Sequence, residues 1–206
     1  MDSFVTYEQL CAVLEQEHAR WYTHPAFDDA KDSHLSESRP WLPAFLSLMW
    51  LTGGRVSEIL QLSGRDIATT TIDGIQVAHI NLTNLKQQPG RNRRKVCSTV
   101  IDEYPICWEH IDNYHEVLIE QDGLLFHRTR QVVWYHCNRI FQLGAHKVGR
   151  HSWVMNHARK DSPLLEIKQQ GGWTRLESMN SYIHEFGINE ITANQLSSFK
   201  KRRGDA

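Results

Sequence analysis

Two arginines stand in local sequence settings that favour binding of an anion such as a phosphate group. Arg55 follows a Thr-Gly-Gly sequence at the start of a helical period, and the N-terminus of a helix attracts negative charge. An ion pair with Glu58 on the next turn would be an equally good use of this arginine. Arg150 lies in the dense cationic segment 146–151, which would also suit a solvated helix start. These residues alone therefore predict candidate phosphate ligands without specifying a reaction.

A third group of cations surrounds a Pro-Gly turn. The flanking segments 75–82 and 94–101 are rich in β-branched residues, which predicts a β-hairpin. A hairpin tip with this charge could enter a groove of a duplex nucleic acid, and it could equally be a solvated turn. No acid interrupts its cations, which are Lys86, Arg91, Arg93, Arg94 and Lys95.

Helical patterns on both sides of this hairpin must position the cations. Apolar residues recur at helical spacing over 7–21, 42–50, 56–60, 108–118 and 133–141. Ser-Pro and Gly-Gly pairs bound a further short helix over 163–171. We therefore predict a mainly α-helical domain with one small antiparallel β-sheet, an α+β fold.

Composition limits the class of protein. The 206 residues are 40% hydrophobic and 23% charged, which excludes a disordered or collagen-like chain. The longest apolar stretch, 42–51, is about half a bilayer span, so we predict no membrane-spanning segment. No charged-then-apolar leader opens the chain, and a cytoplasmic location is expected.

Cysteine spacing and net charge carry less information. The four cysteines include no C-x-x-C pair, so we expect buried thiols and neither a metal site nor a disulfide framework. A formal net charge of -1 argues against a nucleic-acid partner only if the charges are spread evenly. Because the cations are clustered, local field rather than the sum decides what the chain binds.

Three short sequence boxes follow one another along the chain. The first is Thr-Gly-Gly-Arg-Val-Ser-Glu-Ile-Leu around Arg55, the second is Arg-His-Ser at Arg150, and the third combines Gly-Trp at Trp173 with Tyr182. Their order and intervals, with a basic hairpin between the first two, resemble the tyrosine recombinases, the phage-integrase family. The resemblance covers roughly 42–186 and implies the tyrosine-recombinase catalytic-domain fold.

The resemblance implies a specific chemistry. In that family a tyrosine hydroxyl attacks a DNA phosphodiester and leaves a 3′-phosphotyrosine with a free 5′-hydroxyl, and a second 5′-hydroxyl rejoins the DNA without ATP, metal or cofactor. Arg55 and Arg150 would bind the non-bridging oxygens, and Lys86 would protonate the leaving 5′-oxygen, with the other hairpin cations as competitors. The implied catalytic residues are Arg55, Lys86, Lys147, Arg150, Trp173 and the nucleophile Tyr182. The implied DNA-binding residues are Arg91, Arg93, Arg94, Lys95 and His151.

Two positions depart from the commonest family pattern. Lys147 stands where the family usually has histidine, with His146 one place too early, and a lysine transfers protons less readily at neutral pH. Trp173 stands where a later histidine is commonest. Its indole N–H can donate to the same phosphate oxygen, and packing in the core is its other use. His151 is expected to support the site rather than to perform chemistry.

The resemblance also predicts organisation and partners. We divide the chain into a short N-terminal extension (1–40), a catalytic domain (41–187) and a C-terminal helix with a basic tail (188–206). The first segment is too short for the N-terminal clamp domain of most family members. The expected partners are double-stranded DNA with a specific recombination site and further copies of the chain, assembled as a tetramer in a prokaryotic cell.

The predicted function is site-specific DNA recombination or integration by a phage or other mobile element. Two alternatives remain open at this point. The Lys147 departure and the absent clamp domain favour a DNA-binding accessory or regulatory protein that has kept the fold and lost turnover. A type IB topoisomerase would use related chemistry with a lysine and a tyrosine nucleophile.

Overall fold

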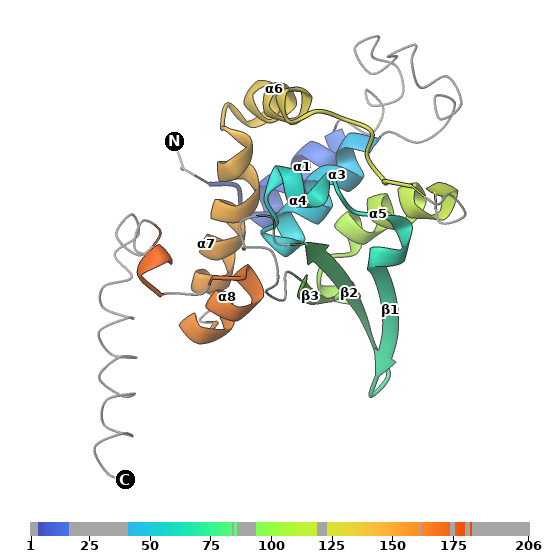
Figure 1. Cartoon of the computed structure of the whole chain (residues 1–206), viewed down its shortest axis with the longest axis vertical. Helices are drawn as coiled ribbons and strands as arrows, with labels where there is room; N and C mark the ends of the chain where they lie inside the picture. The colour runs from blue at the N-terminus through green and yellow to red at the C-terminus, as the bar shows by residue number, and fades with distance from the viewer. Residues whose placement is uncertain are drawn as a thin grey trace.

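The chain folds into packed helices with a three-stranded antiparallel sheet at one end (Figure 1). The computed structural model describes residues 4–16, 41–83, 85, 94–118, 123–160, 162–173, 176–179 and 182. The mainly helical α+β class predicted from the sequence is confirmed. In chain order the elements are α1 (Tyr7–Gln16), α3 (Trp41–Thr52), α4 (Val56–Ile59), η2 (Gly64–Asp66), β1 (Ile67–Ile72), β2 (Ile75–Thr83), β3 (Arg94–Val100), η3 (Ile101–Glu103), α5 (Pro105–Leu118), α6 (Arg130–Phe141), η4 (Lys147–His151), α7 (Ser152–Arg159), α8 (Leu164–Gly171) and η5 (Leu176–Met179).

The sheet contains one strand more than the sequence patterns indicated. β2 and β3 pair antiparallel as expected, and β1 pairs along the other edge of β2. The sequence patterns did not indicate β1, because its residues after Ile67 are all exposed and show no alternation of apolar and polar side chains. A local signal was available, however. Asp73 and Gly74 both have positive φ, 51° and 81°, as a two-residue hairpin turn of type I′ requires.

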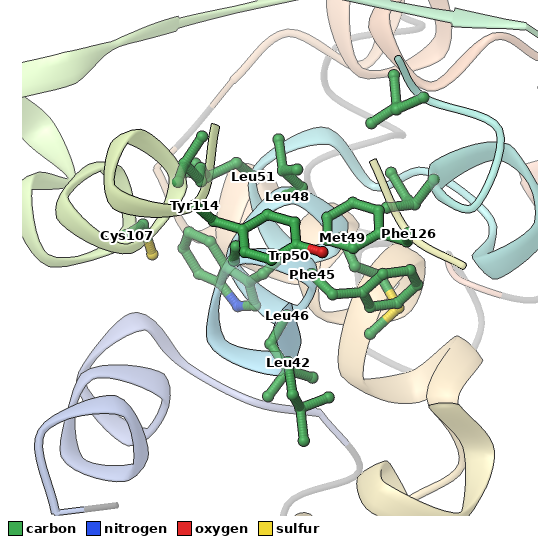
Figure 2. Packing of buried hydrophobic residues seen from close by; sticks show 14 of the residues in the cluster. Leu42, Phe45, Leu46, Leu48, Met49, Trp50, Leu51, Cys107, Tyr114 and Phe126 are labelled. Carbon is green, nitrogen blue, oxygen red and sulfur yellow. The ribbon is translucent and has the colours of Figure 1, made fainter. Parts of the chain in front are cut away.

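α3 is the centre of the fold. The periodicity predicted a helix here with one apolar stripe, but all twelve of its residues are buried. Elements pack around it on every side, and Figure 2 shows Phe45 and Met49 among side chains from other elements. Phe126 meets Phe45 edge-on at 5.0 Å and stacks face to face with Tyr114 at 5.3 Å between ring centroids. We call this large apolar cluster, which extends from α1 to α6, the main core.

The residues that precede α1 form hydrogen bonds with α7, which begins with the serine of the Arg-His-Ser box. The Val5 N–H donates to Ser152 Oγ at 2.7 Å, and the Val5 carbonyl accepts from Trp50 Nε1 at 3.1 Å and from Asn156 Nδ2 at 3.0 Å. Leu10 and Leu14 of α1 are fully buried in the main core. The helix expected over 7–21 is therefore confirmed as far as Gln16, while the C-terminal helix and basic tail expected over 188–206 lie outside the described residues.

All four cysteines are buried, as the sequence suggested, and their thiols are free. Burial raises the pKa of the Cys107 and Cys137 thiols to about 12, which keeps them protonated and unreactive. Within the described ranges, no group of three or more potential metal-ligating side chains comes together. The same part of the chain contains no helix that is long and apolar enough to cross a membrane.

Candidate active site

A tight turn between α3 and α4 places Arg55. α3 ends at Thr52, whose hydroxyl donates to the Leu48 carbonyl at 2.7 Å and accepts from the Gly54 N–H at 3.0 Å. Gly53 has φ of +56°, and a Cβ there would lie 2.7 Å from the indole ring of Trp153. Only glycine satisfies both the left-handed backbone and this close approach, so the Thr-Gly-Gly sequence has a structural cause.

Arg55 is paired with Glu58, the alternative that the sequence left open. Its guanidinium forms an ion pair with the Glu58 carboxylate, which also accepts from the Arg55 backbone N–H at 2.9 Å. The second bond is the carboxylate half of a capping box, so it stabilises the start of α4. The Arg55 side chain remains 25% exposed while that of Glu58 is 1% exposed. Arg55 is therefore held in place and still accessible.

Arg150 is buried, with 6% of its surface exposed, and its guanidinium is held by backbone carbonyls. Nη1 donates to the Gly53 carbonyl at 3.3 Å, and Nη2 donates to the Gly171 carbonyl at 2.6 Å. Burial, and next the charge of Arg55, lower the pKa of Arg150 to about 10, against the opposing effects of Tyr182 and Glu58. The side chain stays cationic at neutral pH, and two like charges share one site.

Trp173 and Tyr182 complete the cluster around this arginine. The guanidinium carbon of Arg150 lies 3.8 Å from the Trp173 ring centroid, a cation–π contact. Tyr182 favours the charged form of Arg150, and its ring meets Trp173 edge-on at 5.7 Å and His151 at 5.5 Å. A Cβ on Gly171 would lie 1.7 Å from the Trp173 ring. The glycine is thus needed for the ring to reach the arginine.

A second, smaller apolar cluster supports these rings. It consists of Trp153, Val154, Ile167 and Met179, with Leu164, Trp173 and Tyr182 packed against it. We call it the site cluster. Its residues come from α7, α8 and η5, which lie together on one side of α3 in Figure 1.

Lys95 enters the site from the sheet, where we had expected an exposed hairpin cation. Its side chain is 7% exposed, and Nζ donates to the Thr52 carbonyl at 3.1 Å. Nζ also lies 6.0 Å from the Trp153 ring centroid. The β2–β3 register gives the reason: Lys95 is opposite Leu82, which is fully buried, so both side chains point to the inner face.

The other predicted site residues are Lys147, His151 and the remaining hairpin cations. Lys147 is half-buried on the π-helical turn η4, and its carbonyl accepts from Ser152 Oγ at 2.6 Å. His151 is buried, and its ring lies beside that of Tyr182. The predictions for Lys86, Arg91 and Arg93 lie outside the described residues, as does the side chain of Arg94.

Sequence reasoning missed the backbone groups that hold the cations. The carbonyls of Thr52, Gly53 and Gly171 together accept from Lys95 and Arg150. Residue types cannot reveal such acceptors, because every residue carries a carbonyl. The inward direction of Lys95 had a signal in the pairing with Leu82, but only once the register was known.

The fold is shared with solved structures of recombinases. A pre-cleavage complex of the XerH site-specific recombinase with its difH substrate matches 93% of this chain and 53% of its own, at 18% identity and a TM-score of 0.55. A post-cleavage complex of XerH with palindromic difH matches 75% of this chain and 45% of its own, at 19% identity and a TM-score of 0.51. The architecture is therefore the tyrosine-recombinase fold, and the chain spans about half the length of these structures. No protein-family model and no curated protein matches the sequence.

Proposed function

We propose that this protein is a site-specific DNA recombinase or integrase that cleaves and rejoins DNA through a phosphotyrosine at Tyr182. The observation that carries the proposal is the packing of Arg150 against Trp173 and of Trp173 against Tyr182, with the charge of Arg55 acting on Arg150. These four residues come from three separate sequence boxes. A tyrosine next to buried cations is the arrangement that attack on a phosphodiester requires.

In the proposed reaction, Tyr182 Oη attacks phosphorus and the bond from phosphorus to the 5′-oxygen breaks. The tyrosine hydroxyl gives its proton to solvent water. The leaving 5′-oxygen receives a proton from Lys86, the role that the family resemblance gives to this lysine. The DNA ends as a 3′-phosphotyrosine and a free 5′-hydroxyl. Attack by another 5′-hydroxyl reverses each bond change. Because the phosphodiester is exchanged rather than hydrolysed, the cycle needs neither ATP nor a cofactor.

The two arginines supply the charge that stabilises the transition state. Arg150 and Arg55 repel each other in the free protein, and a phosphate between them would remove that repulsion. Planar guanidinium groups bind two phosphate oxygens at once, and they cost no reorganisation when they are held beforehand. The Gly53 and Gly171 carbonyls and the Trp173 ring fix Arg150 in this way. Trp173 N–H and Lys147 are proposed as further donors to the same phosphate.

The proposed partner is double-stranded DNA with a specific site, bound by several copies of the chain. The XerH structures were solved with a specific DNA substrate, which supports this choice of ligand. The hairpin cations Arg91, Arg93, Arg94 and Lys86 would approach the DNA backbone, where Lys and Arg provide most of the affinity. His151 would support Tyr182 from within the fold.

A suicide substrate tests the proposal. The substrate is duplex DNA from the region flanking the coding gene, with a nick placed so that cleavage releases a short fragment and traps the adduct. We expect a covalent protein–DNA band for the wild type and none for Tyr182→Phe, with equal binding in a mobility-shift assay. Site-specific binding by the wild type without any adduct would contradict the proposal and favour an accessory DNA-binding protein. Relaxation of supercoiled plasmid irrespective of sequence would favour a type IB topoisomerase.

A further inference from the structure

The side chain of Lys95 is buried although lysine is a charged residue. It points to the inner face of β3 with 7% of its surface exposed, while its neighbour Val96 points outward and is 51% exposed. The β2–β3 register places Lys95 and Cys97 opposite Leu82 and Ile80, both of which are fully buried. A buried lysine loses hydration and side-chain entropy, so its presence here needs a compensating contact.

The compensating contact lies on the turn that carries Arg55. Lys95 Nζ donates to the Thr52 carbonyl at 3.1 Å, and Arg150 Nη1 donates to the next carbonyl, that of Gly53, at 3.3 Å. Cys97 Sγ also donates to the Thr52 carbonyl, at 3.5 Å. Two cations from different elements therefore hold consecutive carbonyls of one turn, and that turn leads directly to Arg55.

Several charged groups near Lys95 act on its pKa. Burial lowers the pKa of Lys95, and the neighbouring Arg150 acts in the same direction, whereas Cys97 and Glu58 favour the charged form. The Glu58 carboxylate is itself bonded to Arg55. In its charged form, Lys95 adds a third cation to a site that already holds two arginines and one carboxylate. An anion bound there would be attracted by all three cations.

We propose that Lys95 is a positioning residue of this site: by holding the Thr52 carbonyl it fixes the turn that aims Arg55, and its charge helps to attract the phosphate. This inference rests on the proposed function. It differs from the role given to Lys86, because Lys95 acts through the turn and does not transfer a proton.

Cleavage kinetics separate positioning from proton transfer. Single-turnover cleavage is measured on the suicide substrate with an ordinary 5′-oxygen and with a 5′-sulfur at the scissile phosphate, because a thiolate leaves without a proton. We expect Lys95→Met to slow cleavage of both substrates by about tenfold to a hundredfold, as small displacements of a catalytic group do. Lys95→Arg should recover most of the rate because it retains a charged donor. Val96→Ala, on the exposed side of the same strand, should match the wild type.

Two results would overturn the inference. Full recovery of Lys95→Met by the sulfur substrate would make Lys95 the proton donor. A Lys95→Met rate equal to the wild type would mean that the buried cation has no role in the site. Urea unfolding of each variant verifies that it is folded under the assay conditions.

A sulfate titration keeps this inference distinct from the proposed function. Thermal melting is followed as sulfate replaces chloride at constant ionic strength, and no DNA is involved. We expect sulfate to raise the Tm of the wild type and of Lys95→Arg, and to raise that of Lys95→Met clearly less. An equal rise in all three proteins would refute the role of Lys95 even if cleavage is observed. Failure of the wild type to form any adduct, with the Lys95 dependence of sulfate binding intact, would refute the recombinase proposal alone.

Discussion

The main core and the site cluster are built on different principles. The main core surrounds α3 with apolar side chains, and its largest members are fully buried. The site cluster has four buried members, and cations contact its rings: Arg150 lies over Trp173 and Lys95 lies near Trp153. The main core therefore provides stability through burial, whereas the site cluster depends on cation–π contacts and on backbone carbonyls.

This difference indicates how the fold separates stability from chemistry. Apolar burial is non-directional and tolerates small displacements, but a cation in a fixed position needs directional partners. The carbonyls of Gly53 and Gly171 are such partners: Gly53 follows the end of α3, and Gly171 is the last residue of α8. We expect substitutions in the main core to change unfolding and substitutions in the site cluster to change cleavage.

The largest effect is expected in the main core. Phe45 is fully buried and meets Phe126 edge-on at 5.0 Å. Phe45→Ala should lower the free energy of unfolding by about 3–5 kcal/mol, because it leaves a cavity that the packed rings cannot fill. Urea unfolding measures this change. Leu165→Ala, at a position that is 51% exposed on α8, is the control, and a similar loss in both variants would contradict the comparison.

Arg150→Lys should affect cleavage more than folding. A lysine keeps the charge but cannot donate to the Gly53 and Gly171 carbonyls with a planar fork. We expect the single-turnover rate of adduct formation to fall by a hundredfold to a thousandfold, equivalent to about 3–4 kcal/mol of barrier. The accompanying loss of unfolding free energy should be smaller than for Phe45→Ala. A rate within threefold of the wild type would show that charge alone suffices.

Acid should weaken the region of the site cluster selectively. His157 packs against Trp153 with tilted rings whose centroids lie 4.4 Å apart, and burial, assisted by the charge of Lys160, lowers its pKa to about 4. The unfolded chain binds a proton at this histidine below about pH 6.5, but the folded chain does so only below about pH 4. Stability should therefore fall by up to roughly 3 kcal/mol as the pH decreases from 6.5 to 4.

Urea unfolding at several pH values measures this dependence, with His157→Gln as the comparison because its side chain does not titrate. The variant should lose the part of the slope that lies between pH 6.5 and 4. An unchanged slope would mean that His157 is not held neutral in the folded protein.

Gly171→Ala should give the smallest of these effects on stability. The new Cβ would lie 1.7 Å from the Trp173 ring, so the ring must leave Arg150. Overpacking of this kind costs about 1–3 kcal/mol of unfolding free energy. We also expect slower adduct formation, because Arg150 loses its ring contact. Gly123→Ala, where a Cβ would meet nothing within 4 Å, should leave both measurements unchanged. Equal behaviour of the two variants would argue against a role for the Trp173 contact.

Periodicity predicted much of the scaffold, and its failures have physical causes. Spacing indicated α3, but complete burial depends on how many elements pack around it, and a single stripe cannot report that. β1 was missed because its exposed threonines carry no alternation. The Asp73-Gly74 turn would have predicted it, since both residues adopt the backbone that such a hairpin requires.

The sequence predicted which side chains form the candidate site, but it did not predict the groups that hold them in place. Ordered boxes predicted Arg55, Arg150, Trp173 and Tyr182 as one group. The fold packs Arg150, Trp173 and Tyr182 together, and the charge of Arg55 acts on Arg150. Their catalytic roles stay predictions, as do those of the hairpin cations. The inward direction of Lys95 depends on strand register, and the carbonyls around Arg150 depend on tertiary packing, so neither can be read from spacing.

Mapping the covalent adduct tests the central claim most directly. The protein–DNA complex trapped on the suicide substrate is digested with nuclease and protease, and the nucleotide-bearing peptide is sequenced by mass spectrometry. We predict one modified peptide, with a nucleotide joined through its 3′-phosphate to the Tyr182 oxygen. A nucleotide on any other residue, or a trapped complex that survives in Tyr182→Phe, would contradict the account.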